Sequence, residues 1–401
     1  MATRTADTNT LFLPWLSSSG EKRRRGLGVD GAVLAVVAGL SLVGVIMVFS
    51  ASAVVAGTRF HDSIYFLKRQ VMWLAAGFVV LHLASRVDYA VWRKLAPWIL
   101  GGTALLLAAV LMPSLGLVAK GARRWLRLGP FSIQPAELFK VAVVLYVASY
   151  LARREDRLMQ FKTGLLPPLA LVGLLSGLVL LQPDLGTVVV VGTVVWLMFF
   201  LAGARPMHLL GLIVAALPVA ALLILRSSYR RQRLMTFLEP WKDAADAGFQ
   251  VTQSFLAFGS GGLFGVGLGE GKQKLFFLPE AHTDFVLALV GEELGLVGTT
   301  AIMLLFVILV LKGFQIAANA RESFGRHLAM GITLLIGVQV LVNAGVVTGV
   351  LPTKGLTLPL VSYGGSSLVV SLLAIGILLS VSRDRQQRRQ GTAHGARVRT
   401  A

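Results

Sequence analysis

Long apolar stretches follow one another along almost the whole chain, and short clusters of charged or turn-forming residues separate them. A bilayer core about 30 Å thick requires roughly 20 apolar residues at a helical rise of about 1.5 Å each, so intervals free of charge mark membrane spans. Seven intervals are clear: between Asp30 and Arg59, Lys94 and Lys120, Lys162 and Asp184, Asp184 and Arg205, Arg205 and Arg226, Arg326 and Lys354, and Lys354 and Arg383. The pattern predicts an all-α polytopic membrane protein.

Three further stretches are shorter or contain charge. They run from Gln70 to Ser85, from Val141 to Ala152 with Glu137 and Lys140 at the start, and from Phe285 to Leu311 with Glu292 and Glu293 inside. Charged side chains within a bilayer are costly, so each needs a partner or a wet cavity. Glu137 and Lys140 are spaced i and i+3 and can pair with each other. Including these stretches, we predict about ten transmembrane helices.

Composition supports the membrane assignment, because 55% of the residues are hydrophobic and only 14% are charged. Soluble proteins carry about 25% charged residues. Cysteine is absent from the sequence, which excludes disulfides, thiolate metal sites and thiol nucleophiles. A net charge of +19 would suggest nucleic-acid binding in a soluble chain, but here the basic residues lie mostly in short segments between apolar runs. That distribution sets membrane topology, and we expect no nucleic-acid partner.

The positive-inside rule places both termini in the cytoplasm, because the basic residues gather in the two tails and in alternate loops. We therefore expect a basic cytoplasmic tail at 1–30, a ten-helix domain at 31–382 and a basic, disordered tail at 383–401. The largest extracytoplasmic loop is 226–284, between spans seven and eight. Most of the unusual chemistry falls on the outer side in this topology.

The second outer loop carries Lys120, Arg123, Arg124 and Arg127 with no acidic residue among them, on the side that the rule disfavours. One interpretation is a tolerated exception or contact with phospholipid headgroups. The other is a phosphate or pyrophosphate site, since Lys and Arg are the usual anion-binding side chains. The residues alone leave both open.

Three ionisable side chains, Glu280, His282 and Asp284, stand within five residues where the long outer loop meets span eight. A carboxylate at this boundary is partly desolvated, which raises its pKa toward the range of a general base. Equally, Asp284 is a suitable N-cap for the span. A His-x-Asp pair is weak evidence for metal ligation, and we predict no metal site.

Other outer segments offer polar groups or unusual backbone. Asp184, between spans five and six, is either a turn residue or part of an outer pocket. In the last outer loop, Lys354 is accompanied by hydroxyls that can bind sugar or phosphate, or simply face solvent, among them Ser362, Tyr363 and Ser366. Six glycines within residues 261–271 match no dinucleotide-binding fingerprint and predict a bent backbone that closely approaches a neighbour or a substrate.

With these motifs in place, the chain resembles the SEDS family of bacterial cell-wall glycosyltransferases over nearly its whole length. The most specific segments are Lys120-Gly-Ala-Arg-Arg-Trp, Gln134-Pro-Ala-Glu-Leu-Phe-Lys, Gln182-Pro-Asp-Leu-Gly-Thr, Gly259-Ser-Gly-Gly-Leu-Phe-Gly, Leu278-Pro-Glu-Ala-His-Thr-Asp-Phe and Pro352-Thr-Lys-Gly-Leu-Thr-Leu-Pro-Leu-Val-Ser-Tyr-Gly-Gly-Ser. The context of Lys354 and the basic N-terminal extension are similar to the cell-division branch of the family more than to its elongation branch.

The resemblance implies a ten-span enzyme that polymerises lipid II into glycan strands outside the cytoplasmic membrane at the division septum. It implies that Asp284 is the essential aspartate, and it carries over Glu280, Lys120 and Lys354 with supporting roles. The implied partners are lipid II, a cognate class B penicillin-binding transpeptidase and other divisome membrane proteins. A cofactor is not required by this chemistry, although a divalent cation, Mg²⁺ or Mn²⁺, could assist.

The implied reaction joins the C4 hydroxyl of an acceptor sugar to the anomeric carbon of a polyprenyl-pyrophosphate donor, with one inversion. Such a transfer needs a base for the acceptor, here Asp284, and positive charge for the leaving group, here Lys120, Arg123 and Arg124, with Lys354 a weaker candidate. A lipid II flippase or other transporter, and a scaffold without catalytic activity, are the two alternative functions.

Overall fold

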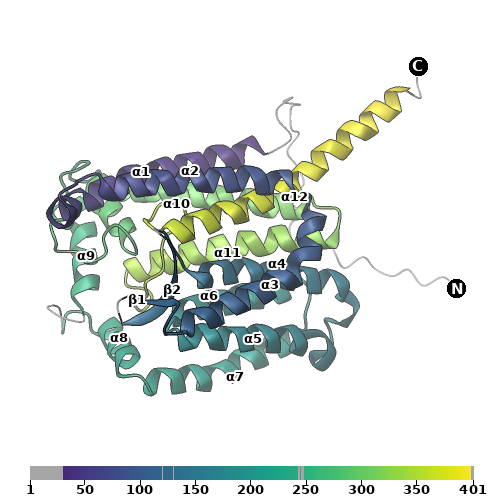
Figure 1. Ribbon diagram of the computed structural model, residues 1–401, viewed down its shortest axis with the longest axis horizontal. Helices are drawn as coiled ribbons and strands as arrows, with labels where there is room; N and C mark the ends of the chain where they lie inside the picture. Colours follow the sequence, from purple (N-terminus) through teal and green to yellow (C-terminus); the bar gives the residue numbers. More distant parts are fainter. Residues whose placement is uncertain (1–29, 120, 130, 243, 245–247, 399–401) are drawn as a thin grey trace.

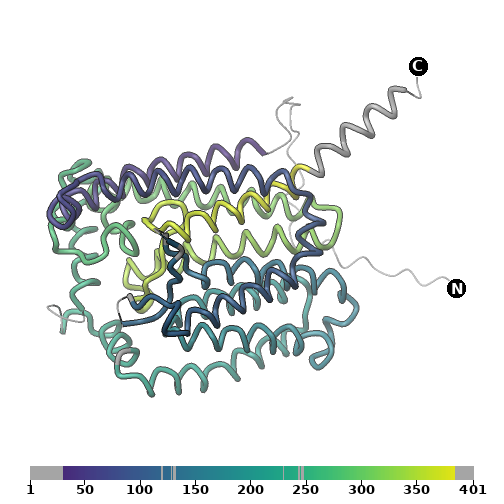
Figure 2. The backbone as a smooth tube through the Cα atoms, in the orientation of Figure 1, coloured from purple at the N-terminus to yellow at the C-terminus, as the bar shows by residue number. Residues whose placement is uncertain are grey.

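The computed structural model describes residues 30–398 except 120, 130, 243 and 245–247. Most of the described chain forms long helices that run roughly along one direction in a single bundle (Figure 1). The backbone trace shows that α1 begins and α12 leaves at the same end of this bundle (Figure 2). The β-strands, α8 and α9 lie toward the opposite end, which we call the loop end.

The elements follow one another in the order predicted from the hydrophobic pattern, with short helices and strands inserted at the loop end. Their bounds are α1 Gly31–Phe60, α2 Tyr65–Arg86, α3 Tyr89–Leu111, β1 Gly116–Ala119, β2 Ala122–Leu128, β3 Phe131–Ile133, α4 Pro135–Arg153, a 3₁₀ turn Glu155–Arg157, a π-helical turn Phe161–Leu165, α5 Leu166–Leu181, α6 Leu185–Leu201, α7 Pro206–Leu225, α8 Ser228–Leu238, α9 Phe249–Gly261, α10 Val286–Ala318, α11 Ser323–Val347 and α12 Gly365–Val398.

Nine helices in the described residues are long and apolar enough to cross a membrane. The shorter apolar helix α6 has 17 residues, or about 25 Å at the helical rise, which is at the lower limit for a span. The predicted all-α, polytopic membrane fold is therefore confirmed. The helical backbone of α12 continues past Arg383, where the sequence pattern placed the start of a disordered tail.

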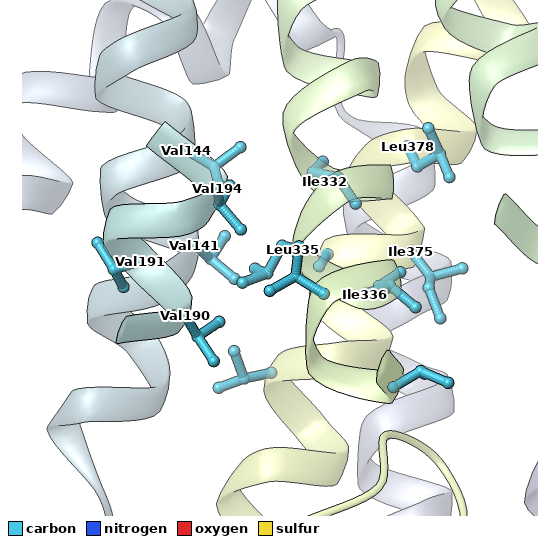
Figure 3. Packing of buried hydrophobic residues seen from close by; sticks show 14 of the residues in the cluster. Val141, Val144, Val190, Val191, Val194, Ile332, Leu335, Ile336, Ile375 and Leu378 are labelled. Carbon is cyan, nitrogen blue, oxygen red and sulfur yellow. The ribbon is translucent and has the colours of Figure 1, made fainter. Parts of the chain in front are cut away.

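The centre of the bundle is packed from small and branched side chains on α4, α6, α11 and α12 (Figure 3). Ile332 and Leu335 of α11 face Val144 of α4 and Val194 of α6, and all four are buried. Branched side chains have few rotamers to lose, so they fill such a close helix contact at low entropic cost. In contrast, α7 buries Leu209 alone and presents its other side chains to its surroundings.

The basic outer loop folds into a three-stranded antiparallel sheet in the order β1-β2-β3, which the hydrophobic pattern did not predict. Along β2, Ala122 and Leu126 are buried while Arg123 and Arg127 are exposed. This is the period of two expected for a strand with one covered face. The alternation covers only a few residues, and the surrounding sequence consists mostly of long apolar helices. The hydrophobic pattern therefore gave little indication of a strand here.

The glycine-rich segment after α9 packs against a break in α10. Gly295 has φ 66° and ψ −164°, which interrupts the helical ladder. The freed backbone pairs with the segment, since Val266 N donates to Glu292 O at 3.0 Å and Leu296 N donates to Gly262 O at 3.0 Å. A Cβ on Gly265 would overlap the carbonyl of Glu293. The predicted close approach of the glycine segment is confirmed.

The two glutamates inside α10 have partners, as their position in a span required. Glu293 pairs with Lys274 at 2.9 Å and accepts a hydrogen bond from Ser50 of α1 at 2.7 Å. Glu292 accepts hydrogen bonds from the backbone N–H groups of Lys272 at 2.7 Å and Gln273 at 3.2 Å. These contacts fix the segment before the Asp284 motif onto α1 and α10. We refer to Ser50, Lys274, Glu292 and Glu293 as the buried glutamate cluster.

The predicted pair within α4 also forms, because Lys140 Nζ lies 2.8 Å from Glu137 Oε2 and both side chains are buried. Each charge thus satisfies the other inside the bundle. A cavity of about 400 Å³ lies beside the buried glutamate cluster, lined by residues of α1 together with Leu268, Gly269 and Lys274. Its lining does not include Asp284.

Candidate active site

Asp284 stands two residues before the first residue of α10, at the loop end of the bundle. The N-cap position of α10 is Phe285, whose side chain makes no capping hydrogen bond, so Asp284 is not the N-cap residue that the sequence left open. Its position is fixed through the backbone: the buried Asn343 amide on α11 donates to Asp284 O at 2.9 Å and to Leu356 O at 2.6 Å. One amide thus joins the start of α10 to the last outer loop.

The backbone of that loop lies directly against the Asp284 carboxylate. A Cβ added to Gly355 would lie 2.8 Å from Asp284 Oδ2, closer than real Cβ contacts allow. The absence of a side chain at Gly355 therefore permits the approach. This contact places the Asp284 carboxylate one residue away from Lys354 along the loop, although the two residues are far apart in sequence.

Glu280 is partly buried and has a local structural role. Its carboxylate accepts a hydrogen bond from Thr283 Oγ1 at 2.8 Å, and its carbonyl accepts from Thr283 N at 3.0 Å. The residue has φ 58°, an uncommon conformation for a residue with a side chain. Glu280 thus stabilises the turn that precedes Asp284.

His282 and Tyr363 belong to an aromatic group with Phe66. The His282 ring centroid is 4.8 Å from that of Phe66 and 5.7 Å from that of Tyr363. Tyr363 N also donates to His282 O at 2.9 Å. Burial raises the pKa of Tyr363, against the opposing effect of the Arg69 guanidinium. Tyr363 therefore stays a neutral hydroxyl at physiological pH and can only donate or accept hydrogen bonds.

Asp184 has a structural role at the turn before α6, and its place in an outer pocket stays a prediction. It caps α6, since its carboxylate accepts from Thr187 N at 3.1 Å and Thr187 Oγ1 at 2.9 Å. The same buried carboxylate acts on Lys354, whose pKa is lowered mainly by burial and raised in part by Asp184. Asp184 is thus a helix cap whose charge also acts on Lys354 of the last outer loop.

The cationic side chains of the basic loop differ in their surroundings. The Arg124 guanidinium donates to the carbonyls of Gln182 at 2.9 Å and Pro183 at 2.7 Å, so it binds the turn that carries Asp184. Arg123 is exposed on β2. Lys120 lies outside the described residues. The proposed pyrophosphate role of all three stays a prediction, and for Arg124 a structural role is already evident.

Ser362 and Ser366, which were predicted to bind substrate, form hydrogen bonds with backbone groups of the protein. Ser362 Oγ accepts from Leu358 N at 2.9 Å within the last loop. Ser366 Oγ accepts from Gln134 N at 3.2 Å and lies 3.3 Å from the carbonyl of Ser132, which ties α12 to β3 and α4. Both side chains are buried. Their hydroxyls therefore fix the loop that carries Lys354 and Gly355.

Three residues at this site were not identified from the sequence: Asn343, Gly355 and Arg233. Arg233 on α8 donates to Thr353 O at 2.8 Å, next to Lys354. Asn343 was recognisable as a lone amide in a long apolar span, and such groups need buried partners. The importance of Gly355 and Arg233 depends on contacts between distant segments, which a single sequence does not reveal.

Metal binding has little support from the donor set. Among the described residues, no three His, Asp or Glu side chains are grouped so that they could hold a metal ion. Asp184 acts on the cationic side chain of Lys354, which opposes binding of a metal ion at that carboxylate. We therefore derive no step through a resident metal.

Known proteins share both the sequence and the fold. The chain matches the FtsW/RodA/SpoVE family model, described as cell cycle protein, over residues 31–387. It is 50% identical over 353 residues to the probable peptidoglycan glycosyltransferase FtsW of Geobacter metallireducens, with 88% of this chain and 94% of that protein covered. It is 44% identical over 345 residues to stage V sporulation protein E of Bacillus subtilis, with 86% and 94% covered.

Two solved structures have the same architecture. One, described as "Structural coordination of polymerization and crosslinking by a peptidoglycan synthase complex", has a TM-score of 0.74 at 32% identity and covers 90% of this chain and 100% of that one. The crystal structure of rod shape determining protein RodA from Thermus thermophilus has a TM-score of 0.65 at 31% identity and covers 90% and 99%. The resemblance inferred from the motifs is confirmed, and the chain belongs to the FtsW/RodA/SpoVE family.

Proposed function

We propose that this protein polymerises lipid II into glycan strands at the outer face of the bacterial cytoplasmic membrane, during synthesis of the septal cell wall. It is a peptidoglycan glycosyltransferase, as its relatives and family are. The observation that carries the proposed mechanism is the Asp284 carboxylate held against Gly355, one residue from Lys354. The candidate base thereby lies against the same loop that carries Lys354.

In this mechanism Asp284 removes the proton from the acceptor C4 hydroxyl as that oxygen attacks the anomeric carbon of the donor. The bond from the anomeric carbon to the pyrophosphate oxygen breaks, and its electron pair leaves with the pyrophosphate. Cationic groups near Lys354 stabilise the added negative charge, so a general acid is unnecessary. Asp284 serves as the catalytic base, and Glu280 supports the turn that positions it. A divalent ion carried by the pyrophosphate stays a further proposal.

The partners follow from the same proposal. A membrane polymerase that supplies glycan strands needs a crosslinking enzyme, and a matched structure is described as coordinating polymerization with crosslinking. We infer a cognate class B penicillin-binding transpeptidase as the partner, together with other membrane proteins of the divisome. The multi-pass membrane location agrees with the apolar helices. Location at the septum and the cytoplasmic placement of both tails are proposed from the family and the charge pattern.

The contact between Gly355 and Asp284 gives one direct prediction. Gly355→Ala adds a methyl group 2.8 Å from Asp284 Oδ2, so the carboxylate must move. A displacement of about 1 Å in a catalytic group can cost up to about 100-fold in rate, and we expect kcat to fall by roughly 10- to 100-fold. The measurement is steady-state polymerisation of lipid II with the partner transpeptidase present.

Gly364→Ala is the matched control for this variant, because its added Cβ would make ordinary contacts of 3.5 Å with Thr357 and 3.6 Å with Ser367. Its kcat should stay within about twofold of wild type. A Gly355→Ala protein with wild-type kcat would show that the carboxylate can move without loss, and would argue against Asp284 as a precisely positioned base.

The function itself is tested with purified protein, fluorescent lipid II and the partner in detergent. We expect glycan polymer from wild-type protein, because polymerisation needs no membrane sidedness. In liposomes we expect translocation of labelled lipid II no faster than in protein-free controls. Robust translocation with no polymer would support the flippase alternative, and partner activation with no polymer of its own would support the scaffold.

A further inference from the structure

Two helices indicate independently where the bilayer core ends on the side of the loop end. The core takes about 20 helical residues. Counted from Gly31, the first residue of α1, that length ends at Ser50. Counted back along α10 from Lys312, it ends at Glu292. The next residue, Glu293, accepts a hydrogen bond from Ser50 at 2.7 Å, so both counts reach the same level. We call this level the outer boundary.

The glycine-rich segment lies at the outer boundary. Val266 N donates to Glu292 O, and Leu296 N donates to Gly262 O, each at 3.0 Å. These bonds satisfy backbone groups that the break at Gly295 frees, as a bilayer environment requires. The segment is therefore fixed beside the stretch of α10 where the bilayer core ends.

The side chains that this part of the chain exposes are mostly large and apolar. Phe264 is 80% exposed. The exposed residues between 263 and 277 include Leu263, Phe264, Leu268, Leu275, Phe276 and Phe277. Soluble surfaces rarely leave so many large apolar side chains uncovered in one short stretch. At the outer boundary the same side chains can enter the hydrocarbon, as those of amphipathic interfacial segments do.

The cavity of about 400 Å³ lies between α1 and this segment. Its lining includes Ile46, Phe49, Ala53 and Val54 of α1 and Leu268 of the segment. From Ile46 to Val54 the wall runs about 12 Å along the helix, at a rise of about 1.5 Å per residue, and crosses the outer boundary. Phe49 and Leu268 are themselves exposed, so the lining reaches the surface that faces the bilayer. The volume is in the range of ligand-binding sites.

The polar side chains in the described lining are Ser50 and Lys274, and they are already bonded. Lys274 Nζ donates to Ser50 Oγ at 3.1 Å and to the carbonyl of Gly269. It also donates to Glu293 at 2.9 Å, which uses the last of the three donors of an ammonium group. The lining thus has no spare cation for an anionic headgroup. Its apolar walls instead favour a hydrocarbon chain, which needs no hydrogen-bond partner.

From these observations we propose that residues 263–277 form an interfacial segment in the leaflet at the loop end, and that one acyl chain of a bilayer phospholipid occupies the cavity between this segment and α1. The leaflet is the outer one in the proposed topology. The described lining includes no residue of the Asp284 motif or of the last outer loop, so the occupant need not carry the reacting sugar. The bound chain joins the segment to α1. The inference is independent of the proposed glycosyl transfer and requires only that α1 and α10 span the membrane.

The depth of the segment is measured with single spin labels on the full-length protein, since the chain contains no native cysteine. Phe264→Cys, Leu42→Cys and Arg59→Cys are labelled in vesicles of phosphatidylethanolamine and phosphatidylglycerol, and collisions with oxygen and with a nickel chelate are compared. Leu42 and Arg59 are exposed on α1, about 12 Å below and about 13 Å beyond the outer boundary. We expect Phe264→Cys to resemble Leu42→Cys, with nickel collisions at least about threefold fewer than in Arg59→Cys.

Two results of this measurement would overturn the membrane placement. One is a label at position 264 that collides with nickel as often as the label of Arg59→Cys. The other is protection that appears only after the partner transpeptidase is added, because the exposed apolar side chains would then form a protein contact.

The occupant of the cavity is identified by native mass spectrometry of full-length protein released from membranes in mild detergent. We expect wild-type protein to retain phospholipid, and retention to fall at least about tenfold in Ala53→Phe, which fills the cavity. Ile46→Trp fills it from another turn of α1, and thermal unfolding shows whether each variant is folded. Leu42→Phe is the matched control, because residue 42 is outside the lining, and its retention should stay within about twofold of wild type.

The lipid mass separates the proposal from a site for the polyprenyl substrate. Wild-type protein that carries no phospholipid, or a polyprenyl lipid alone, would overturn the proposal. Equal phospholipid retention in wild type, Ala53→Phe and Ile46→Trp would overturn it as well, because the retained lipid would then lie outside the cavity.

Discussion

Asp284→Asn is expected to lower the rate of lipid II polymerisation by at least about 100-fold, because it removes the base while keeping the size of the side chain. The backbone carbonyl of Asp284 still accepts the hydrogen bond from Asn343, so the junction between α10 and the last loop is kept. Asp284 precedes the N-cap residue Phe285, and an asparagine at this position can make the same kind of hydrogen bond to backbone N–H groups, so we expect α10 to form in the variant. The measurement is polymer length and rate with the partner present, alongside thermal unfolding.

Glu280→Gln is the comparison for this variant. A glutamine oxygen can still accept the hydrogen bond from Thr283, so the turn should form and the loss should be smaller than at Asp284. Equal loss at both positions, with both proteins folded, would mean that the proton transfer cannot be assigned to Asp284 alone. Retained polymerisation in Asp284→Asn would exclude the catalytic assignment.

The membrane fold was largely predictable from the sequence, because the length of a span and the cost of buried charge are properties of local segments. Even the three doubtful spans formed helices, and their charges found the partners that the bilayer requires. The sheet at β1 to β3 was not predicted. Its strands are short. Ala122 and Leu126 are buried by segments that are distant in sequence, so the sequence of the loop does not indicate their burial.

The candidate site was predictable only in part. Asp284, Asp184 and Lys354 stand out because each is a charged residue at a membrane boundary, and the structure brings their surroundings together. The contributions of Arg233 and Gly355 come from segments that meet only after folding. Ser362 and Ser366 were predicted as ligand-binding hydroxyls from their composition, but both bind backbone groups of the protein. A hydroxyl in a loop can bind a ligand or a backbone group of the protein, and the groups around it in the folded structure determine which.

The buried glutamate cluster gives the second large expected effect. Lys274 Nζ contacts Glu293 at 2.9 Å, Ser50 Oγ at 3.1 Å and the carbonyl of Gly269, and its side chain is 8% exposed. Lys274→Met keeps the length of the side chain but leaves Glu292 and Glu293 with no ammonium group between α1 and the loop. Breaking a buried ion pair by removing one partner costs about 3–5 kcal/mol. We expect a loss of this size in the free energy of unfolding.

The same variant should also reduce polymerisation, because residues 269–274 lead directly into the turn that carries Glu280 and Asp284. Lys272→Met is the matched control: its side chain is exposed, while its backbone N–H donates to Glu292 in either protein. This control should change the unfolding free energy by less than about 0.5 kcal/mol.

The double variant Lys274→Met/Glu293→Gln separates loss of charge balance from loss of packing. A glutamine at position 293 can still bond to Ser50 Oγ and to Gly269 N, which both donate to Glu293 now. If the cost of Lys274→Met comes from an uncompensated carboxylate, neutralising Glu293 should recover a large part of the lost stability. No recovery would mean that the ammonium stabilises the loop chiefly through Gly269 and Ser50. In that case the ion pair would contribute little to the position of Asp284, and the glycine segment would depend on its backbone pairing with α10 alone.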